Sequence, residues 1–207
     1  MQKWVIMDAM GVIFKVGDDT KELLVPYIKR LNPEIKSKTI VDLYLKASLG
    51  GITSRMFWKR TGLGNLYPKV EINYLNEYLK VNPQTIKLAK RLKKRYKLAI
   101  LSNDIKEWSV FLCKKFGLIK LFNRAVISGE ARARKPALKI FNILQKRLKI
   151  KPGMAVLLDD NIRNIKAAIN YGLKGILIVH KVKENIKENV EYSTIQDAYN
   201  KIIKILI

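Results

Sequence analysis

The chain has 207 residues, of which 48% are apolar, so it can build a substantial core and is not expected to be disordered. Its single cysteine, Cys113, excludes an internal disulfide. With 41 Lys and Arg against 17 Asp and Glu, the formal charge is +24, which suits an anionic partner. The lysines are spread along the whole chain without a zinc pattern or an aromatic–basic motif, so we expect nucleic acid to be an unlikely partner.

The amino end does not show the charged, apolar and small-residue pattern of a signal peptide. No uninterrupted apolar run is long enough to span a bilayer. We therefore expect a cytoplasmic protein with no membrane partner. The oligomeric state does not follow from the sequence.

The first predicted element is a buried strand over residues 4–7, which read Trp-Val-Ile-Met. Asp8 follows at once, so its carboxyl group is expected at the carboxyl end of a strand, where open α/β sheets hold their ligands. Gly11 allows the backbone to turn closely around whatever Asp8 binds. The plainer interpretation is an Asp that caps a turn after a strand.

The stretch from about residue 19 to residue 80 keeps helical spacing of its apolar residues. The breaks at Asn32-Pro33 and Gly50-Gly51 divide it, and Thr53 or Ser54 is expected to cap a further helix. Residues 70–79 are the last helix of the set. Since no strand signal occurs here, we predict a helical insertion, in which Phe57 and Trp58 serve packing rather than substrate contact.

From Asn82 onwards, helices and strands alternate. The predicted helices cover 83–95, 105–116, 137–149, 161–171 and 195–206, and the predicted strands cover 97–101, 124–127, 154–158 and 175–179. This alternation predicts an α/β fold with a parallel sheet and helices on both of its faces.

Polar side chains follow three of these strands. Ser102 and Asn103 come after one strand, Asp159 and Asp160 after another, and the loop 128–136 places Lys135 just before a helix. Because parallel strands end at the same edge of a sheet, we expect these side chains to converge on Asp8. Ser102 or the Asp pair acting as helix caps, and Lys135 as a surface lysine, are the plainer interpretations.

These residue types together suit phosphoryl transfer. Clustered carboxylates repel one another, and a hard divalent cation such as Mg²⁺ relieves that repulsion. A serine hydroxyl, backbone N–H groups and a lysine can hold the oxygens of a phosphoryl group. Asp8 is then left to attack in line and to form a covalent acyl phosphate.

The chain resembles the haloacid dehalogenase superfamily of aspartate-nucleophile hydrolases. Within it, the chain is most similar to the small phosphatases related to the amino-terminal domain of soluble epoxide hydrolase. The residues that carry the resemblance are Asp8-Ala9-Met10-Gly11-Val12, Leu101-Ser102-Asn103, Gly129-Glu130, Arg134-Lys135-Pro136, Leu158-Asp159-Asp160-Asn161, Asn164, Ala167-Ala168 and Gly172. The resemblance implies a Rossmann-like core of residues 1–15 and 81–207, and a four-helix cap domain of residues 16–80.

The resemblance also implies a Mg²⁺-dependent hydrolase of small phosphorylated metabolites that forms an aspartyl phosphate. On this basis Asp8 is the nucleophile, and Ser102, Asn103 and Lys135 bind the phosphate, with Ser102 and Lys135 also catalytic. The expected metal ligands are Asp8, the main-chain carbonyl of Met10, and one or both of Asp159 and Asp160. Asn164 is expected to support the metal loop from behind.

The chain departs from the pattern at Met10, where phosphatases of this family commonly carry an Asp that protonates the leaving group. Asp18, Asp19 or Glu130 is a possible substitute, whereas His180 is not expected to be one. One alternative is a 2-haloacid dehalogenase-like hydrolase, because loss of halide needs no proton. In that case Arg55 or Arg60, from the cap, would bind the substrate carboxylate. The other alternative is a weakly catalytic or non-catalytic binding protein.

Overall fold

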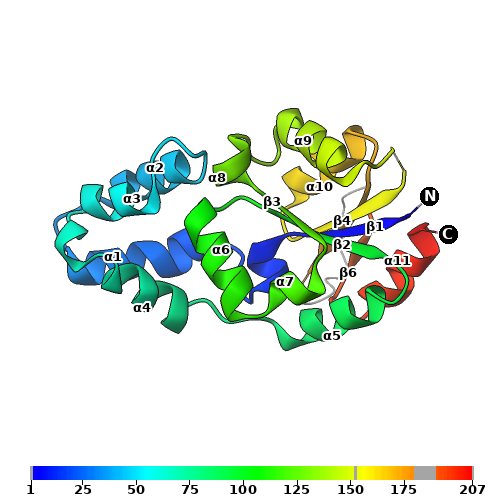
Figure 1. Cartoon of the computed structure of the whole chain (residues 1–207), viewed down its shortest axis with the longest axis horizontal. Helices are drawn as coiled ribbons and strands as arrows, with labels where there is room; N and C mark the ends of the chain where they lie inside the picture. Colours follow the sequence, from blue (N-terminus) through cyan, green and yellow to red (C-terminus); the bar gives the residue numbers. More distant parts are fainter. Residues whose placement is uncertain (1, 152, 180–189, 207) are drawn as a thin grey trace.

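The computed structural model describes residues 2–151, 153–179 and 190–206. Its centre is a parallel sheet in the order β3-β2-β1-β4-β5-β6 (Figure 1). The strands are β1 (Trp4–Met7), β2 (Lys97–Ser102), β3 (Arg124–Ile127), β4 (Ala155–Asp159), β5 (Lys174–Ile178) and β6 (Tyr192–Ser193). Trp4 pairs with both Lys97 and Ala155, so β1, β2 and β4 begin level with one another and their carboxyl ends lie at the same edge of the sheet. The predicted α/β fold with a parallel sheet is confirmed.

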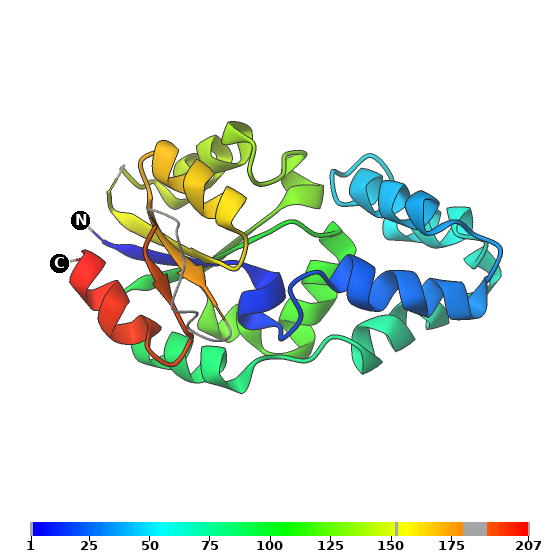
Figure 2. The ribbon, with the colours of Figure 1, turned by 180° about the vertical axis from the view of Figure 1, so that it is seen from behind.

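The two faces of the sheet separate by the alternation of side chains along each strand. Met7 packs into one apolar cluster with α5, α6 and α11, whereas its neighbour Ile6 packs into another with α9 and α10. These helices are α5 (Pro83–Leu92), α6 (Lys106–Lys115), α9 (Leu138–Leu148), α10 (Ile162–Asn170) and α11 (Ala198–Leu206). Figure 2 shows the two helical layers from behind.

The inserted helices lie beyond the carboxyl ends of the strands, at the opposite end of the molecule from the two termini (Figure 1). They are α1 (Val25–Leu31), entered through the π-helical turn η2 (Thr20–Leu24), then α2 (Ser37–Ala47), α3 (Ser54–Arg60), the 3-10 turn η3 (Gly64–Leu66) and α4 (Lys69–Glu77). Thr53 caps α3, because its hydroxyl accepts from the Met56 N–H at 3.2 Å. That contact decides between Thr53 and Ser54.

Aromatic side chains join the inserted helices to the sheet layer. Phe57 and Trp58 are fully buried, and both rings contact Trp108 of α6. The indole N–H groups of Trp58 and Trp108 donate to the same carboxylate oxygen of Glu71, at 2.8 and 2.7 Å. Phe57 and Trp58 therefore serve packing, as the sequence predicts.

The elements that the sequence pattern missed are short. They are the turns η1 (Ala9–Ile13) and η3, the helices α7 (Leu118–Leu121) and α8 (Ser128–Ala131), and the strand β6, none long enough to show a periodicity. Two helix ends also differ from prediction, since the helix begun at Pro83 ends at Leu92 and the last helix begins at Ala198. Among the described residues, no helix has the length and apolar character needed to cross a membrane.

Candidate active site

Asp8 is the first residue after β1. Its main-chain N–H donates to the Leu158 carbonyl at 2.9 Å, which continues the ladder with β4, and its carboxylate accepts from the Ala9 N–H at 2.7 Å. β1 lies between β2 and β4, so the connections leave it in both directions at this edge. Such a reversal of strand order opens a crevice at the strand ends, and Asp8 lies in it.

Lys135 lies directly behind Asp8. Its ammonium nitrogen is 2.8 Å from Asp8 Oδ1 and 2.7 Å from Asp159 Oδ2, with the Lys135 side chain 1% exposed. The backbone of Lys135 is fixed by Asn103, whose side-chain amide donates to the Lys135 carbonyl at 2.9 Å and accepts from the Lys135 N–H at 2.8 Å. Burial lowers the pKa of Lys135, but Asp159 and Asp8 outweigh it and the net pKa is raised, so the ammonium charge is kept.

Asp159 is completely buried and its carboxylate is surrounded by donors. Oδ1 accepts from the Asn161 N–H at 2.9 Å and from the Asn164 amide at 3.0 Å. Oδ2 accepts from Lys135 at 2.7 Å and from Asn164 at 3.1 Å. Asn164 therefore holds the Asp159 carboxylate in place.

The carboxylate of Asp160 lies close to those of Asp8 and Asp159. A Cβ atom on Gly11 or on Gly17 would lie 2.1 or 2.2 Å from Asp160 Oδ2, so two glycines make room for this carboxylate. Gly11 also has φ of 73°, which a residue with a side chain rarely adopts. Oxygen atoms of Asp8, Asp159 and Asp160 all lie within 4.8 Å of one another.

The charges at this cluster fit a divalent cation. Burial raises the pKa of the Asp8 carboxyl well above its usual range, Asp159 adds to the rise, and Lys135 opposes it. A nucleophilic carboxylate has to be ionised, and an added cation among three carboxylates would lower the Asp8 pKa again. The donor set consists of oxygen atoms, which Mg²⁺ prefers.

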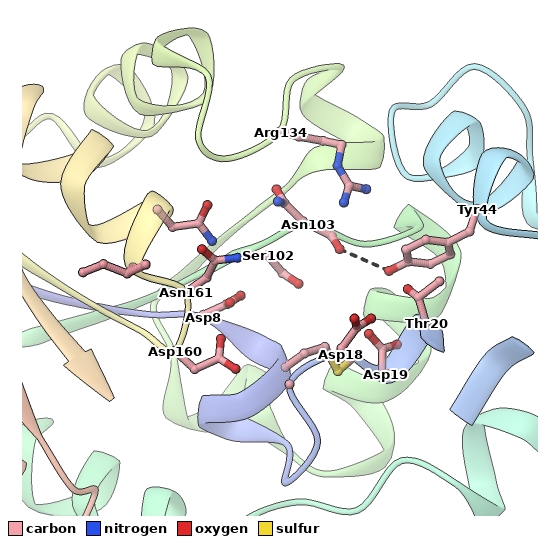
Figure 3. Close-up of a pocket in the computed structure, with 14 residues that line it drawn as sticks. Asp8, Asp18, Asp19, Thr20, Tyr44, Ser102, Asn103, Arg134, Asp160 and Asn161 are labelled. Atoms are coloured by element: carbon pink, nitrogen blue, oxygen red, sulfur yellow. Dashed lines mark hydrogen bonds between the residues drawn. The ribbon is translucent and has the colours of Figure 1, made fainter. Parts of the chain in front are cut away.

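A cavity of about 450 Å³ opens above Asp8. Figure 3 shows residues from the sheet edge on one side of it and residues from the inserted helices and their linker on the other. The lining residues are Asp8, Met10, Gly17, Asp18, Asp19, Thr20, Tyr44, Ser102, Asn103, Arg134, Asp160, Asn161, Ile162 and Asn164. Lys135 and Asp159 do not line it, because they are buried behind Asp8.

The Ser102 hydroxyl indicates that the cavity binds a ligand. Its hydroxyl is buried, lines the cavity and has no hydrogen-bond partner among residues 2–151, 153–179 and 190–206. A buried hydroxyl without a partner is costly, so an oxygen of a bound group is expected to complete it.

The far side of the cavity holds residues to which the sequence analysis assigned no binding role. The Tyr44 hydroxyl, from α2, donates to the Asn103 carbonyl at 3.2 Å (Figure 3). Arg134 contacts the Ser48 hydroxyl at the end of α2 and also lines the cavity. Arg134 stands beside Lys135 in the sequence, and that position is the one signal that points to it; Tyr44 reaches the cavity only through the docking of α2.

The acids considered as substitutes for an acid at Met10 differ in whether they line the cavity. Asp18 and Asp19 line the cavity, but Glu130 does not and pairs instead with Arg147 at 3.0 Å. Asp19 is 5% exposed. His180 lies outside the described residues.

Arg55 and Arg60, considered as carboxylate ligands in a dehalogenase, are absent from the lining of this cavity as the structure describes it. Arg55 instead lines a separate hollow of the inserted helices, with Met56 and Lys59.

The sequence profile of the haloacid dehalogenase-like hydrolases matches residues 6–178. The chain therefore belongs to this family of hydrolases, and the predicted superfamily is confirmed.

One curated relative is the glyceraldehyde 3-phosphate phosphatase of Methanothermobacter thermautotrophicus, which is 30% identical over 101 residues. That match covers 47% of this chain and 44% of the relative, so it spans less than half of either protein.

Two solved structures show the same fold at low identity. A haloacid dehalogenase family enzyme from Bacteroides thetaiotaomicron superposes with a TM-score of 0.76 at 20% identity, covering 88% of this chain and 96% of its own. The same enzyme has been solved in complex with magnesium and inorganic phosphate. The L-2-haloacid dehalogenase of Xanthobacter autotrophicus superposes with a TM-score of 0.70 at 16% identity, covering 98% and 99%.

Proposed function

We propose that the protein is a Mg²⁺-dependent phosphohydrolase of small phosphorylated metabolites, with Asp8 as the nucleophile. The observation that carries this proposal is the pairing of Asp8 with a buried Lys135 beneath a polar cavity, where the Ser102 hydroxyl has no partner in the described structure. The phosphatase relative and the fold neighbour that binds magnesium and phosphate support the same substrate class.

Asp8 and Asp160 would hold the metal directly, together with the Met10 carbonyl. Both carboxylates line the cavity, whereas Asp159 is buried and already accepts from Lys135, Asn161 and Asn164. Asp159 then acts by fixing the negative charge behind the site. When bound, Mg²⁺ neutralises the charge of the phosphoryl oxygens and keeps Asp8 ionised.

The protein's own groups divide the remaining work. The Ser102 hydroxyl donates to a phosphoryl oxygen, and Lys135 supplies a fixed positive charge behind the group being transferred. Asn103 keeps that charge in place, since both ends of its side-chain amide are bonded to the Lys135 backbone. The Asp8 carboxylate attacks the phosphorus atom in line with the leaving oxygen, and water later hydrolyses the acyl phosphate.

We further propose that residues 16–80 act as a cap domain on a core of residues 1–15 and 81–207. The residues that face Asp8 across the cavity come in part from this segment, namely Asp18, Asp19, Thr20 and Tyr44. A cavity of about 450 Å³ suits a small metabolite rather than a polymer. The cap would therefore select the leaving group, whereas the core transfers the phosphoryl group.

A 2-haloacid dehalogenase is the second candidate function. Arg134 lines the cavity and can bind a carboxylate, and Met10 does not matter for a halide leaving group. The acid cluster around Asp8 weighs against it, because a metal site is not needed for halide displacement by a carboxylate.

A screen of aryl, sugar and alkyl phosphates, with Mg²⁺ and with EDTA, tests the proposal beside a halide-release assay on short 2-haloacids. We expect Mg²⁺-dependent release of phosphate that Asp8→Asn abolishes while the fold is retained. Release of halide in EDTA, with no phosphate release from any ester, would assign the protein as a dehalogenase instead.

A further inference from the structure

A phosphatase with Met10 beside its nucleophile lacks an obvious proton donor. An alkoxide leaves poorly without a proton, and a positioned acid accelerates such a step by about 10²–10⁴-fold. Met10 lines the cavity, and a thioether side chain has no proton to give. The acid for alkyl or sugar esters therefore has to come from another group on the cavity wall.

We propose that Asp19, at the entry to the cap, is the general acid and base of the reaction. This inference rests on the proposed phosphohydrolase function and names the residue that serves the leaving group. Asp19 lines the same cavity as Asp8 and faces it from the opposite wall (Figure 3). Its carboxyl oxygen Oδ2 is buried and, in the part of the chain that the structure describes, has no hydrogen-bond partner.

The surroundings of Asp19 keep its carboxyl protonated. Burial raises its pKa from 3.8 to about 8, and the carboxylates of Asp104 and Asp18 add to the rise. The other titratable groups that face it are the phenols of Tyr44 from α2 and Tyr74 from α4, and both pKa values are raised, chiefly by burial. The positive charge of Arg134 opposes the rise in pKa of the neighbouring Asp104 and Tyr44.

The other lining groups are less suited to the role. Asp18 is 47% exposed at its side chain and pairs with Lys21 at 3.1 Å, so it is a solvated carboxylate. The Tyr44 hydroxyl already donates to the Asn103 carbonyl. Asp8 and Asp160 belong to the nucleophile and metal cluster.

The proton balance closes over the two steps. As Asp8 attacks, the bond from phosphorus to the ester oxygen breaks, and that oxygen takes the Asp19 proton and leaves as an alcohol. Water then attacks the phosphorus atom of the aspartyl phosphate and gives a proton to the Asp19 carboxylate. The bond from phosphorus to Asp8 breaks, which releases phosphate and restores both carboxyl groups.

The test compares wild type, Asp19→Asn and the matched control Glu130→Gln, which changes an acid away from the cavity lining, on 2-glycerophosphate and 4-nitrophenyl phosphate. The parameter is kcat/KM, which reports only the steps up to departure of the leaving group. In Asp19→Asn we expect kcat/KM to fall about 10²–10⁴-fold for the alkyl ester and less than about 10-fold for the aryl ester. Glu130→Gln should keep the wild-type ratio between the two esters.

Two further readouts separate catalysis from a structural effect. On the alkyl ester, wild-type kcat/KM should fall above pH about 8, and this limb should be absent from Asp19→Asn. Met10→Asp in the Asp19→Asn background should restore alkyl ester hydrolysis selectively, because it returns an acid to the same cavity.

An equal loss on both esters, or an unchanged ratio in Asp19→Asn, would overturn the role of Asp19 while leaving the phosphohydrolase proposal intact. Failure of the wild type to hydrolyse any ester would overturn the proposed function, and this inference with it.

Discussion

The two walls of the cavity differ in how completely their polar groups are paired. Behind the sheet edge, Lys135, Asp159 and Asn164 form a closed network in which each carboxylate oxygen of Asp159 accepts two hydrogen bonds, and the Ser102 hydroxyl in front of it is left open to a ligand. On the opposite wall, Asp19 has a buried oxygen without a partner among the described residues. The sheet edge is therefore suited to hold the phosphoryl group rigidly. The opposite wall is suited to exchange a proton with the leaving group and with water.

The largest effect is expected from removing the charge at the centre of the paired wall. Lys135→Met leaves Asp8 and Asp159 buried without their cation, so the free energy of unfolding in EDTA should fall by about 3–5 kcal/mol. We also expect kcat/KM to fall by about 10²–10³-fold, since a fixed charge at the phosphoryl group is lost. Urea unfolding and steady-state kinetics measure both.

Lys139→Met, at an exposed position of α9, is the matched control and should change neither quantity. A Lys135→Met protein with wild-type stability in EDTA would contradict the account of the paired wall.

On the opposite wall, the expected effect is a pH dependence of stability. The pKa of Asp19 is raised in the folded protein, to about 8 from 3.8, so the folded state binds the proton more tightly than the unfolded chain. This stability is fully present below pH 3.8 and is lost as the pH rises to about 8. At pH 9, the free energy of unfolding of Asp19→Asn should exceed that of wild type by several kcal/mol, and the gap should close towards pH 4.

Urea unfolding of both proteins across this pH range measures the gap. A constant difference between Asp19→Asn and wild type at all pH values would mean that Asp19 titrates normally and that the two walls do not differ in this way.

A smaller effect is expected from the support behind Asp159. Asn164→Ala removes both amide hydrogen bonds to that carboxylate and leaves Asp8 and Asp160, the proposed metal ligands, unchanged. Loss of such a supporting contact lowers metal affinity by about 10–100-fold. Titration calorimetry with Mg²⁺ measures the change, with Asn170→Ala at the end of α10 as the control. Equal Mg²⁺ affinity in Asn164→Ala and wild type would show that Asp159 needs no orientation.

The smallest effect is expected at Tyr44. Tyr44→Phe keeps the ring in place and removes the hydroxyl, which contacts the Asn103 carbonyl at 3.2 Å and, more weakly, Asp104 Oδ1 at 3.5 Å. The free energy of unfolding should fall by about 1 kcal/mol, as for an ordinary neutral hydrogen bond. A loss as large as that of Lys135→Met would show that the cap wall is also a tightly built network.

The paired wall could be predicted from the sequence, and much of the cap wall could not. Asp8, Ser102 and Asp159 follow or end buried strands, and the alignment of parallel strands brings such positions together whatever the rest of the chain does. Tyr44 and Arg134 meet only because α2 docks on the loop before α9, which local periodicity does not report. The part played by Asn103 was hidden for a similar reason, since its partner is the backbone of Lys135, 32 residues away.

Met10 shows how far local sequence reasoning extends. It stands two residues after Asp8, where phosphatases of this family commonly carry an acid, so the sequence shows that this acid is missing. The sequence offers Asp18, Asp19 and Glu130 equally as substitutes. Only their surroundings distinguish them: Asp18 pairs with Lys21, Glu130 pairs with Arg147, and Asp19 is buried in the cavity wall.

The central claim is that Asp8 carries the phosphoryl group covalently. Its most direct measurement is an acid quench of the enzyme during turnover of radiolabelled 4-nitrophenyl phosphate with Mg²⁺, followed by mapping of the labelled peptide. We expect label on Asp8, a larger amount in Asp19→Asn because water is then activated poorly, and none in Asp8→Asn. Undiminished turnover in Asp8→Asn, or label on another residue, would contradict the account.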